Sequence, residues 1–134
     1  MTNSNLRLWA EFDLDVDIEK AGEAEKAGRG RIRGIVSSEK KDADGEVILQ
    51  DGLDFSWFKT HGFFTLEHPL NAMNVIGEPV ELQKTTIGDG IAATEVVGEL
   101  YLKDPVALGV WRKAVAIKKS GGQRRLGMSI EGRV

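Results

Sequence analysis

Strict alternation of apolar and polar residues near the start of the chain is the feature that most constrains its fold. Every even position from Leu6 to Ile18 is apolar, and the odd positions from Arg7 to Glu19 are polar or charged apart from Trp9. Only an extended strand places residues at this spacing on a single face, whereas a helix would scatter them around its circumference. We therefore predict one long strand, or two strands in line, with a solvated acidic face.

The rest of the chain predicts further strands and one clear helix. The polar, glycine-rich stretch 20–30 is typical of a mobile hairpin loop. Further strands are expected at 31–38, 46–49, 63–67, 74–82, 91–102 and around Ser129, with Pro79 near an edge or a bulge. A short helix is expected at 54–60, stopped by Gly62, and a longer one from the N-cap Asp104 and Pro105 to Gly121 and Gly122. The expected fold is mainly β (α+β), a small β-barrel or sandwich of about seven strands with one or two surrounding helices.

Composition excludes several classes of function. The net charge of −3 argues against a general nucleic-acid binder, and the absence of cysteine excludes disulfides and thiolate chemistry. No apolar run approaches the roughly 20 residues that span a bilayer, and no secretory leader is recognisable, so we expect a cytoplasmic protein with no membrane partner.

Residues 1–134 are expected to form one domain. Because the chain stops at Val134, just after the strand of Ser129, we expect a shortened form, truncated at the C-terminus.

Ser129 is the first candidate for chemistry. In the segment Arg124–Gly132, apolar residues at 126, 128 and 130 alternate with Gly127, Ser129 and Glu131. In a strand the apolar positions face the core, so the hydroxyl of Ser129 is predicted to point away from it. An outward serine is a candidate nucleophile, although most such serines are surface residues.

A serine nucleophile needs a base, and the chain has only two histidines. His61 falls near a predicted helix end, where a histidine caps carbonyls or meets solvent. His68 ends a predicted strand, just before Pro69, where a side chain can be presented into a cleft. Strand alternation also allows His68 to point partly toward the core.

Two other patterns have competing interpretations. Arg124 and Arg125 are either a solvated pair or groups that help to hold an oxyanion or an acidic substrate. The segment Asp42–Glu46 looks like the start of a calcium loop. It fails because Val47 and Leu53 occupy the positions where an EF-hand needs glycine and glutamate, so a turn is the better interpretation.

Taken together, these segments resemble the phage prohead proteases, serine proteases that mature viral capsids and are distant relatives of the herpesvirus assembly protease. The resemblance rests on three stretches in the same order and at similar spacing: Ile32–Ser38 with Asp42–Ile48, His68 with Val75–Pro79, and Arg124–Gly132.

The resemblance implies a herpesvirus-protease-like β-barrel in which Ser129 is the nucleophile and His68 the general base. It implies no metal or organic cofactor, and cleavage of scaffold and major capsid proteins, and of itself, inside the assembling procapsid in the host bacterial cytoplasm. A homodimer is expected by the same analogy. In the herpesvirus relatives the third member is a histidine that follows the serine; here none follows Ser129, so the candidates are Glu131, Glu67 or a residue beyond Val134.

Two alternatives stay open. One is a non-catalytic β-barrel that serves as a scaffold or structural module of a phage capsid. The other is an unrelated esterase or amidase, but the segment around Ser129 lacks the second glycine of a Gly-x-Ser-x-Gly elbow.

Overall fold

The protein is described from a computed structural model. The backbone is described at residues 5–39, 54–66 and 72–133, and the side chains at 11–39, 54–66 and 72–127. The turn expected at 40–45, the strand expected at 46–49 and the calcium-like segment Asp42–Glu46 lie outside these residues.

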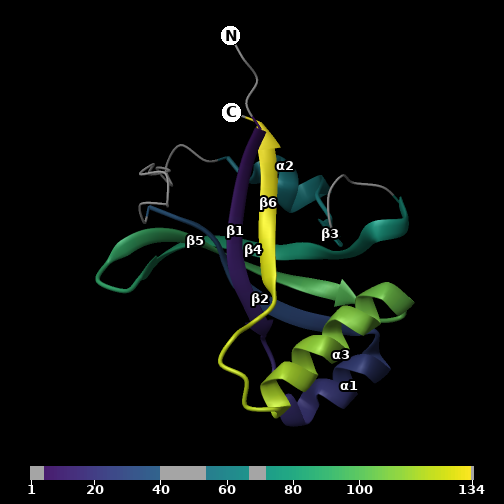
Figure 1. Ribbon diagram of the computed structural model, residues 1–134. Coiled ribbons are helices and arrows are strands. Elements are labelled where there is room, and N and C mark those ends of the chain that lie inside the picture. Colours follow the sequence, from purple (N-terminus) through teal and green to yellow (C-terminus); the bar gives the residue numbers. More distant parts are fainter. Residues whose placement is uncertain (1–4, 40–53, 67–71, 134) are drawn as a thin grey trace.

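The described strands form one antiparallel, curled sheet in the order β3-β4-β5-β2-β1-β6. Figure 1 shows the sheet as an open half-barrel with helices beside it. Their bounds are β1 Asn5–Leu14, β2 Arg29–Ser38, β3 Phe64–Thr65, β4 Val75–Ile87, β5 Ile91–Tyr101 and β6 Gly127–Arg133. The α+β class is therefore confirmed.

The expected closed barrel of about seven strands is wrong for the described residues, which contain six strands in an open sheet. Closure requires the edge strands to pair with each other, and two features work against it. Strand β3 has only two residues. Strand β1 pairs with β2 only at Phe12, Asp13 and Leu14, and its earlier residues pair with β6 instead.

The first predicted strand ends earlier than expected, and the predicted loop at 20–30 is wrong. After β1, the chain forms a 3₁₀ turn at Ile18–Lys20 and then helix α1 at Ala21–Ala27. Alanine, glutamate and lysine are good helix formers, and burial of Ala21 holds the helix on the core. Gly28, with φ of 82°, ends the helix in the left-handed conformation and leads directly into β2.

The other local predictions are largely confirmed. Helix α2 spans Ser56–His61 and ends at Gly62, and α3 spans Pro105–Lys119 with the Asp104 carboxylate accepting from the amide of Ala107 at 3.0 Å. The register of β4 shifts between Pro79 and Glu81, so the expected bulge is present. A second 3₁₀ turn, η3, covers Ala72–Asn74.

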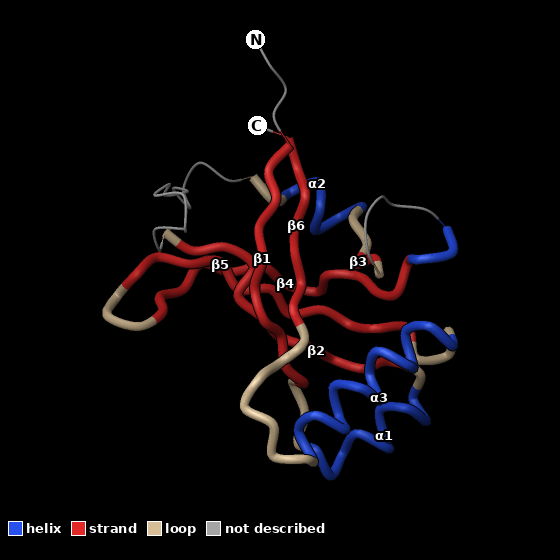
Figure 2. Tube along the Cα trace, viewed as in Figure 1, coloured by secondary structure: helices blue, strands red, loops and turns tan. Residues whose placement is uncertain are grey.

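The core lies between one face of the sheet and helix α3, which Figure 2 shows beside α1 at one end of the molecule. Trp111 of α3 is fully buried among Ile32, Leu100 and Leu102. Its ring packs directly on Gly30, where an added Cβ would approach the ring to 2.6 Å. Glycine is therefore required at this position in β2, because a side chain would push α3 off the sheet.

The opposite face of the sheet carries a cross-strand ionic ladder. Arg29 of β2 pairs with Glu78 of β4 at 2.5 Å and lies over the ring of Tyr101 at 5.2 Å. Further along β2, Arg33 bridges Asp15 at 2.9 Å and Glu95 at 2.5 Å. These pairs link Arg29 and Arg33 of β2 to β4, to β5 and to the residue that follows β1, and they keep this face polar.

Acid is expected to destabilise the fold through this ladder. The hydrogen bond from Arg29, with a smaller contribution from Tyr101, holds the pKa of Glu78 below its ordinary value. A depressed carboxyl pKa gives stability that is present above the unfolded pKa, about 4.3, and lost as pH falls through the folded one. Urea midpoints measured between pH 6 and 3 should therefore fall less steeply for Glu78→Gln than for the unmodified chain. If the urea midpoints of the two proteins fall equally with pH, protonation of Glu78 does not contribute to acid unfolding.

Candidate functional site

Ser129 lies on β6, the last strand in the sheet order, which is present as predicted. Strand β6 pairs with β1 at seven positions from Asn5↔Arg133 to Glu11↔Gly127, with Ser129 opposite Trp9 and Glu131 opposite Arg7. Among the described strands, β1 is its only neighbour. The side chains of Ser129 and Glu131 lie outside the described residues, so the structure places both residues by backbone register alone.

The approach to this strand is set by the end of α3. The helix stops after its two terminal lysines, Gly121 takes the left-handed conformation with φ of 72°, and the amide of Gly122 donates back to the carbonyl of Ile117 at 3.1 Å. The chain then reaches β1, where the amide of Phe12 donates to the carbonyl of Leu126 at 2.9 Å. The pairing of β6 begins one residue later.

The two arginines in this approach differ in their surroundings. Arg124 is exposed. Arg125 is partly buried, and its Nε donates to Asp13 Oδ2 at 3.0 Å while its Nη1 donates to the carbonyls of Gly122 at 2.7 Å and Arg124 at 3.0 Å. The guanidinium of Arg125 is thus engaged within the fold, and of the pair Arg124 is the one directed to solvent.

Asp13 is the acceptor at the centre of this arrangement. Its Oδ2 also lies 3.4 Å from Nζ of Lys118, and its Oδ1 accepts from the amide of Leu14 at 2.8 Å. Burial acts to raise the pKa of Asp13, but the hydrogen bonds from Arg125 and Leu14, together with the positive charges of Lys118 and Arg125, outweigh it and hold the pKa below its ordinary value. The carboxylate is therefore charged at neutral pH.

His68 lies outside the described residues, between two described anchors at the other end of the sheet order. The preceding chain leaves β3 at Leu66, whose amide donates to the carbonyl of Asn74 at 2.7 Å. Within β3, the ring of Phe64 packs against Gly98 of β5. Because β3 and β6 lie at opposite ends of the sheet order, a pair formed by His68 and Ser129 requires the curl of the sheet to bring these ends together.

His61 is the last residue of α2, close to the helix end expected for it. Its ring lies 5.7 Å from the ring of Trp57, measured between centroids. His61 is exposed, so it meets solvent, which is one of the two environments expected for it.

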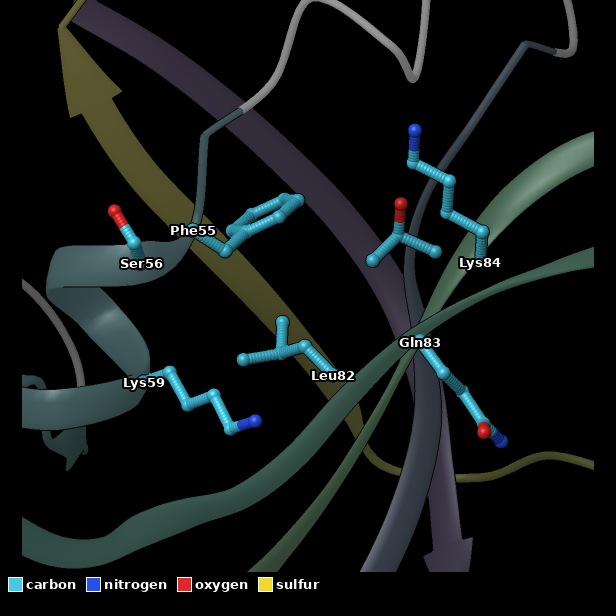
Figure 3. Close-up of a pocket in the computed structure, with 7 residues that line it drawn as sticks. Phe55, Ser56, Lys59, Leu82, Gln83 and Lys84 are labelled. Atoms are coloured by element: carbon cyan, nitrogen blue, oxygen red, sulfur yellow. The ribbon is translucent and has the colours of Figure 1, made fainter.

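A shallow pocket that the sequence did not reveal lies between α2 and the β4–β5 hairpin (Figure 3). Its volume is about 210 Å³, and it is lined by Phe55, Ser56, Lys59, Leu82, Gln83, Lys84 and Thr94. Phe55 and Leu82 give it an apolar wall, and Lys59 and Lys84 add positive charge. Such a lining suits an apolar group beside a negative charge. Its residues come from segments far apart in the chain, and only the alternation of Leu82 and Lys84 hinted at a shared face.

Neither a metal site nor a membrane span is found within the described ranges. No group of three or more His, Asp and Glu residues there is placed to hold an ion. No helix there has the length and apolar character needed to cross a bilayer.

Comparison with family models, with curated proteins and with solved structures finds no match for this chain.

Proposed function

We propose that the protein is a serine endopeptidase of phage prohead maturation. Ser129 is the nucleophile, His68 the general base, and Glu131 the group that orients the histidine, with Glu67 as the in-chain alternative. The substrates are scaffold and major capsid proteins and the protease chain itself, inside the procapsid in the bacterial cytoplasm. A homodimer is part of the same proposal.

One observation carries the proposal: the segment around Ser129 that resembles the prohead proteases forms a strand, β6. The α+β class adds support, because a curled antiparallel sheet with helices packed beside it is the coarser part of the fold that the resemblance implies; the described sheet is open and not a barrel. We also propose that the fold is related to the barrel of the herpesvirus protease.

The proposed chemistry is acyl transfer. His68 takes the proton of the Ser129 hydroxyl as its oxygen attacks the peptide carbonyl, and backbone amides near Arg124 and Arg125 hold the oxyanion. His68 then gives that proton to the leaving amine, and the C–N bond breaks. Water, deprotonated by His68, hydrolyses the acyl-enzyme ester and regenerates Ser129.

The test is covalent labelling of the purified chain with a fluorophosphonate probe, which reacts with activated serines. Ser129→Ala is expected to abolish labelling, because the attacking oxygen is gone. Ser120→Ala is the matched control, since Ser120 caps α3 outside the proposed site and its loss should leave labelling unchanged. Equal labelling of the Ser129→Ala variant would refute the assignment. In an infected cell, the same substitution should leave scaffold uncleaved and arrest assembly at the procapsid.

A second candidate, a non-catalytic structural module of the capsid, is favoured by one observation. Large apolar side chains are exposed in α2, on either side of β3 and in the 3₁₀ turn before β4: Trp57 at 67%, Phe63 at 47%, Leu66 at 43% and Met73 at 85%. Exposed apolar surface of this kind is typical of a protein interface. Absence of labelling together with normal assembly of the Ser129→Ala phage would favour this candidate.

A further inference from the structure

The carboxylate of Asp13 joins three parts of the chain at one point. Asp13 lies at the end of β1, Lys118 is in the last turn of α3, and Arg125 is in the loop that leads into β6. Oδ2 accepts from Nε of Arg125 at 3.0 Å and lies 3.4 Å from Nζ of Lys118. The junction is therefore formed by residues far apart in the sequence.

The carboxylate of Asp13 is also held by the backbone of its own strand. Oδ1 of Asp13 accepts from the amide of Leu14 at 2.8 Å, which fixes the rotation of the carboxylate relative to its own strand. Because this carboxylate is already fixed, less conformational entropy is lost when it binds the planar guanidinium of Arg125. The position of β1 therefore sets the position of Arg125.

Arg125 in turn shapes the loop. Its Nη1 donates to the carbonyls of Gly122 and Arg124, so one side chain bridges β1 and the backbone of the loop. The loop is also tied at Gly122, whose amide donates to Ile117, and at Leu126, whose carbonyl accepts from Phe12. Between these two ties, Arg125 is the residue that fixes the path of the chain into β6.

We propose that Asp13 and Arg125 are positioning residues for Ser129: the ion pair sets the placement of β6 on β1, and with it the location of the nucleophile four residues beyond Arg125. The inference rests on the proposed function for its catalytic consequence. It also gives Arg125 a role different from oxyanion binding. Misplacement of a reacting atom by about 1 Å is enough to cost on the order of 100-fold in rate, so a modest shift of β6 is measurable.

The chain provides a matched ion pair as a control. Arg112 of α3 donates to Oε1 of Glu25 in α1 from Nε at 2.9 Å and from Nη2 at 2.7 Å. This pair joins the two helices and touches neither β1 nor the loop before β6. It therefore separates the loss of an arginine–carboxylate pair in general from the loss of the one that positions Ser129.

The experiment compares Asp13→Asn, Arg125→Gln, the double variant and Glu25→Gln in the full-length chain. Asparagine at position 13 keeps an oxygen for the amide of Leu14 but presents an uncharged amide to Arg125. The maximal labelling rate with a fluorophosphonate probe should fall about tenfold in each single variant, with the half-saturating probe concentration unchanged. The double variant should be no slower than the slower single, because both remove the same interaction. Glu25→Gln should keep the wild-type rate.

Amide hydrogen exchange over residues 127–133 gives a second readout that does not require activity. Exchange should accelerate in Asp13→Asn and Arg125→Gln and stay at the wild-type rate in Glu25→Gln. Unchanged exchange in the first two variants, or equal changes in all three, would overturn the positioning role. If the wild-type chain does not react with the probe, the proposed function fails, and exchange alone decides whether the pair positions β6.

Discussion

Replacing His68 by alanine is expected to slow fluorophosphonate labelling and peptide cleavage by a factor on the order of 10⁴ or more. The reason is that a serine hydroxyl is a weak nucleophile without a base to take its proton. If His68 is that base, its loss in peptide cleavage should match that of Ser129→Ala, and the double variant should cleave no more slowly, because residues that act as a unit are not additive. Cleavage rates of the two single variants and the double variant measure this directly.

The second histidine makes the experiment specific. His61 is seven residues away, ends helix α2 and contacts Trp57. His61→Ala removes the same functional group from the same region and should leave the labelling rate unchanged. If His61→Ala loses labelling and His68→Ala keeps it, the base is His61 and not His68. The site would then lie at the exposed end of α2.

Replacing Trp111 by alanine is expected to destabilise the fold by about 3–5 kcal/mol, as for other large aromatic residues removed from a core. Trp111 is fully buried at the centre of the contact between α3 and the sheet, and Gly30 has no side chain to fill the space. Small domains of this size have about 5–15 kcal/mol in total, so the variant should be close to unfolding at 37 °C. Urea denaturation followed by circular dichroism measures the loss.

Trp111→Phe separates packing from hydrogen bonding at the same position. The indole Nε1 is buried and no described group accepts its proton, so phenylalanine removes an unpaired donor while keeping most of the ring. We expect a much smaller loss of stability than for alanine. An equal loss in both variants would show that the indole N–H has a partner essential to the core.

Local sequence signals predicted the elements that depend on neighbours in the chain. The alternation in β1 and β5 and the Asp104–Pro105 start of α3 are such signals, and all three elements formed. Helix α1 was missed because Gly22 and Gly28 suggested a loop. The helix gains stability because Ala21 and Ala24 pack against the core, which a sequence pattern of seven residues does not reveal.

Closure of the sheet and the make-up of the site depend on long-range geometry and were harder to predict. Nothing local shows that β1 divides its pairing between β2 and β6, and this division opens the predicted barrel. The strand of Ser129 follows from its alternation, but the contact between Arg125 and Asp13 joins residues more than a hundred positions apart. Two adjacent arginines look alike in the sequence, and only the fold distinguishes the one that binds β1 from the one that faces solvent.

The pairing of β1 with β6 also has a consequence for the order in which the molecule is made. Residues 5–11 are synthesised more than a hundred positions before their partners at 127–133. Contacts of such wide sequence separation form late, because the entropy of closing the intervening loop must be overcome first. A nascent chain therefore carries β1 without β6 until residues 127–133 have emerged. Under the proposed function, the nucleophile Ser129 is out of place until that point.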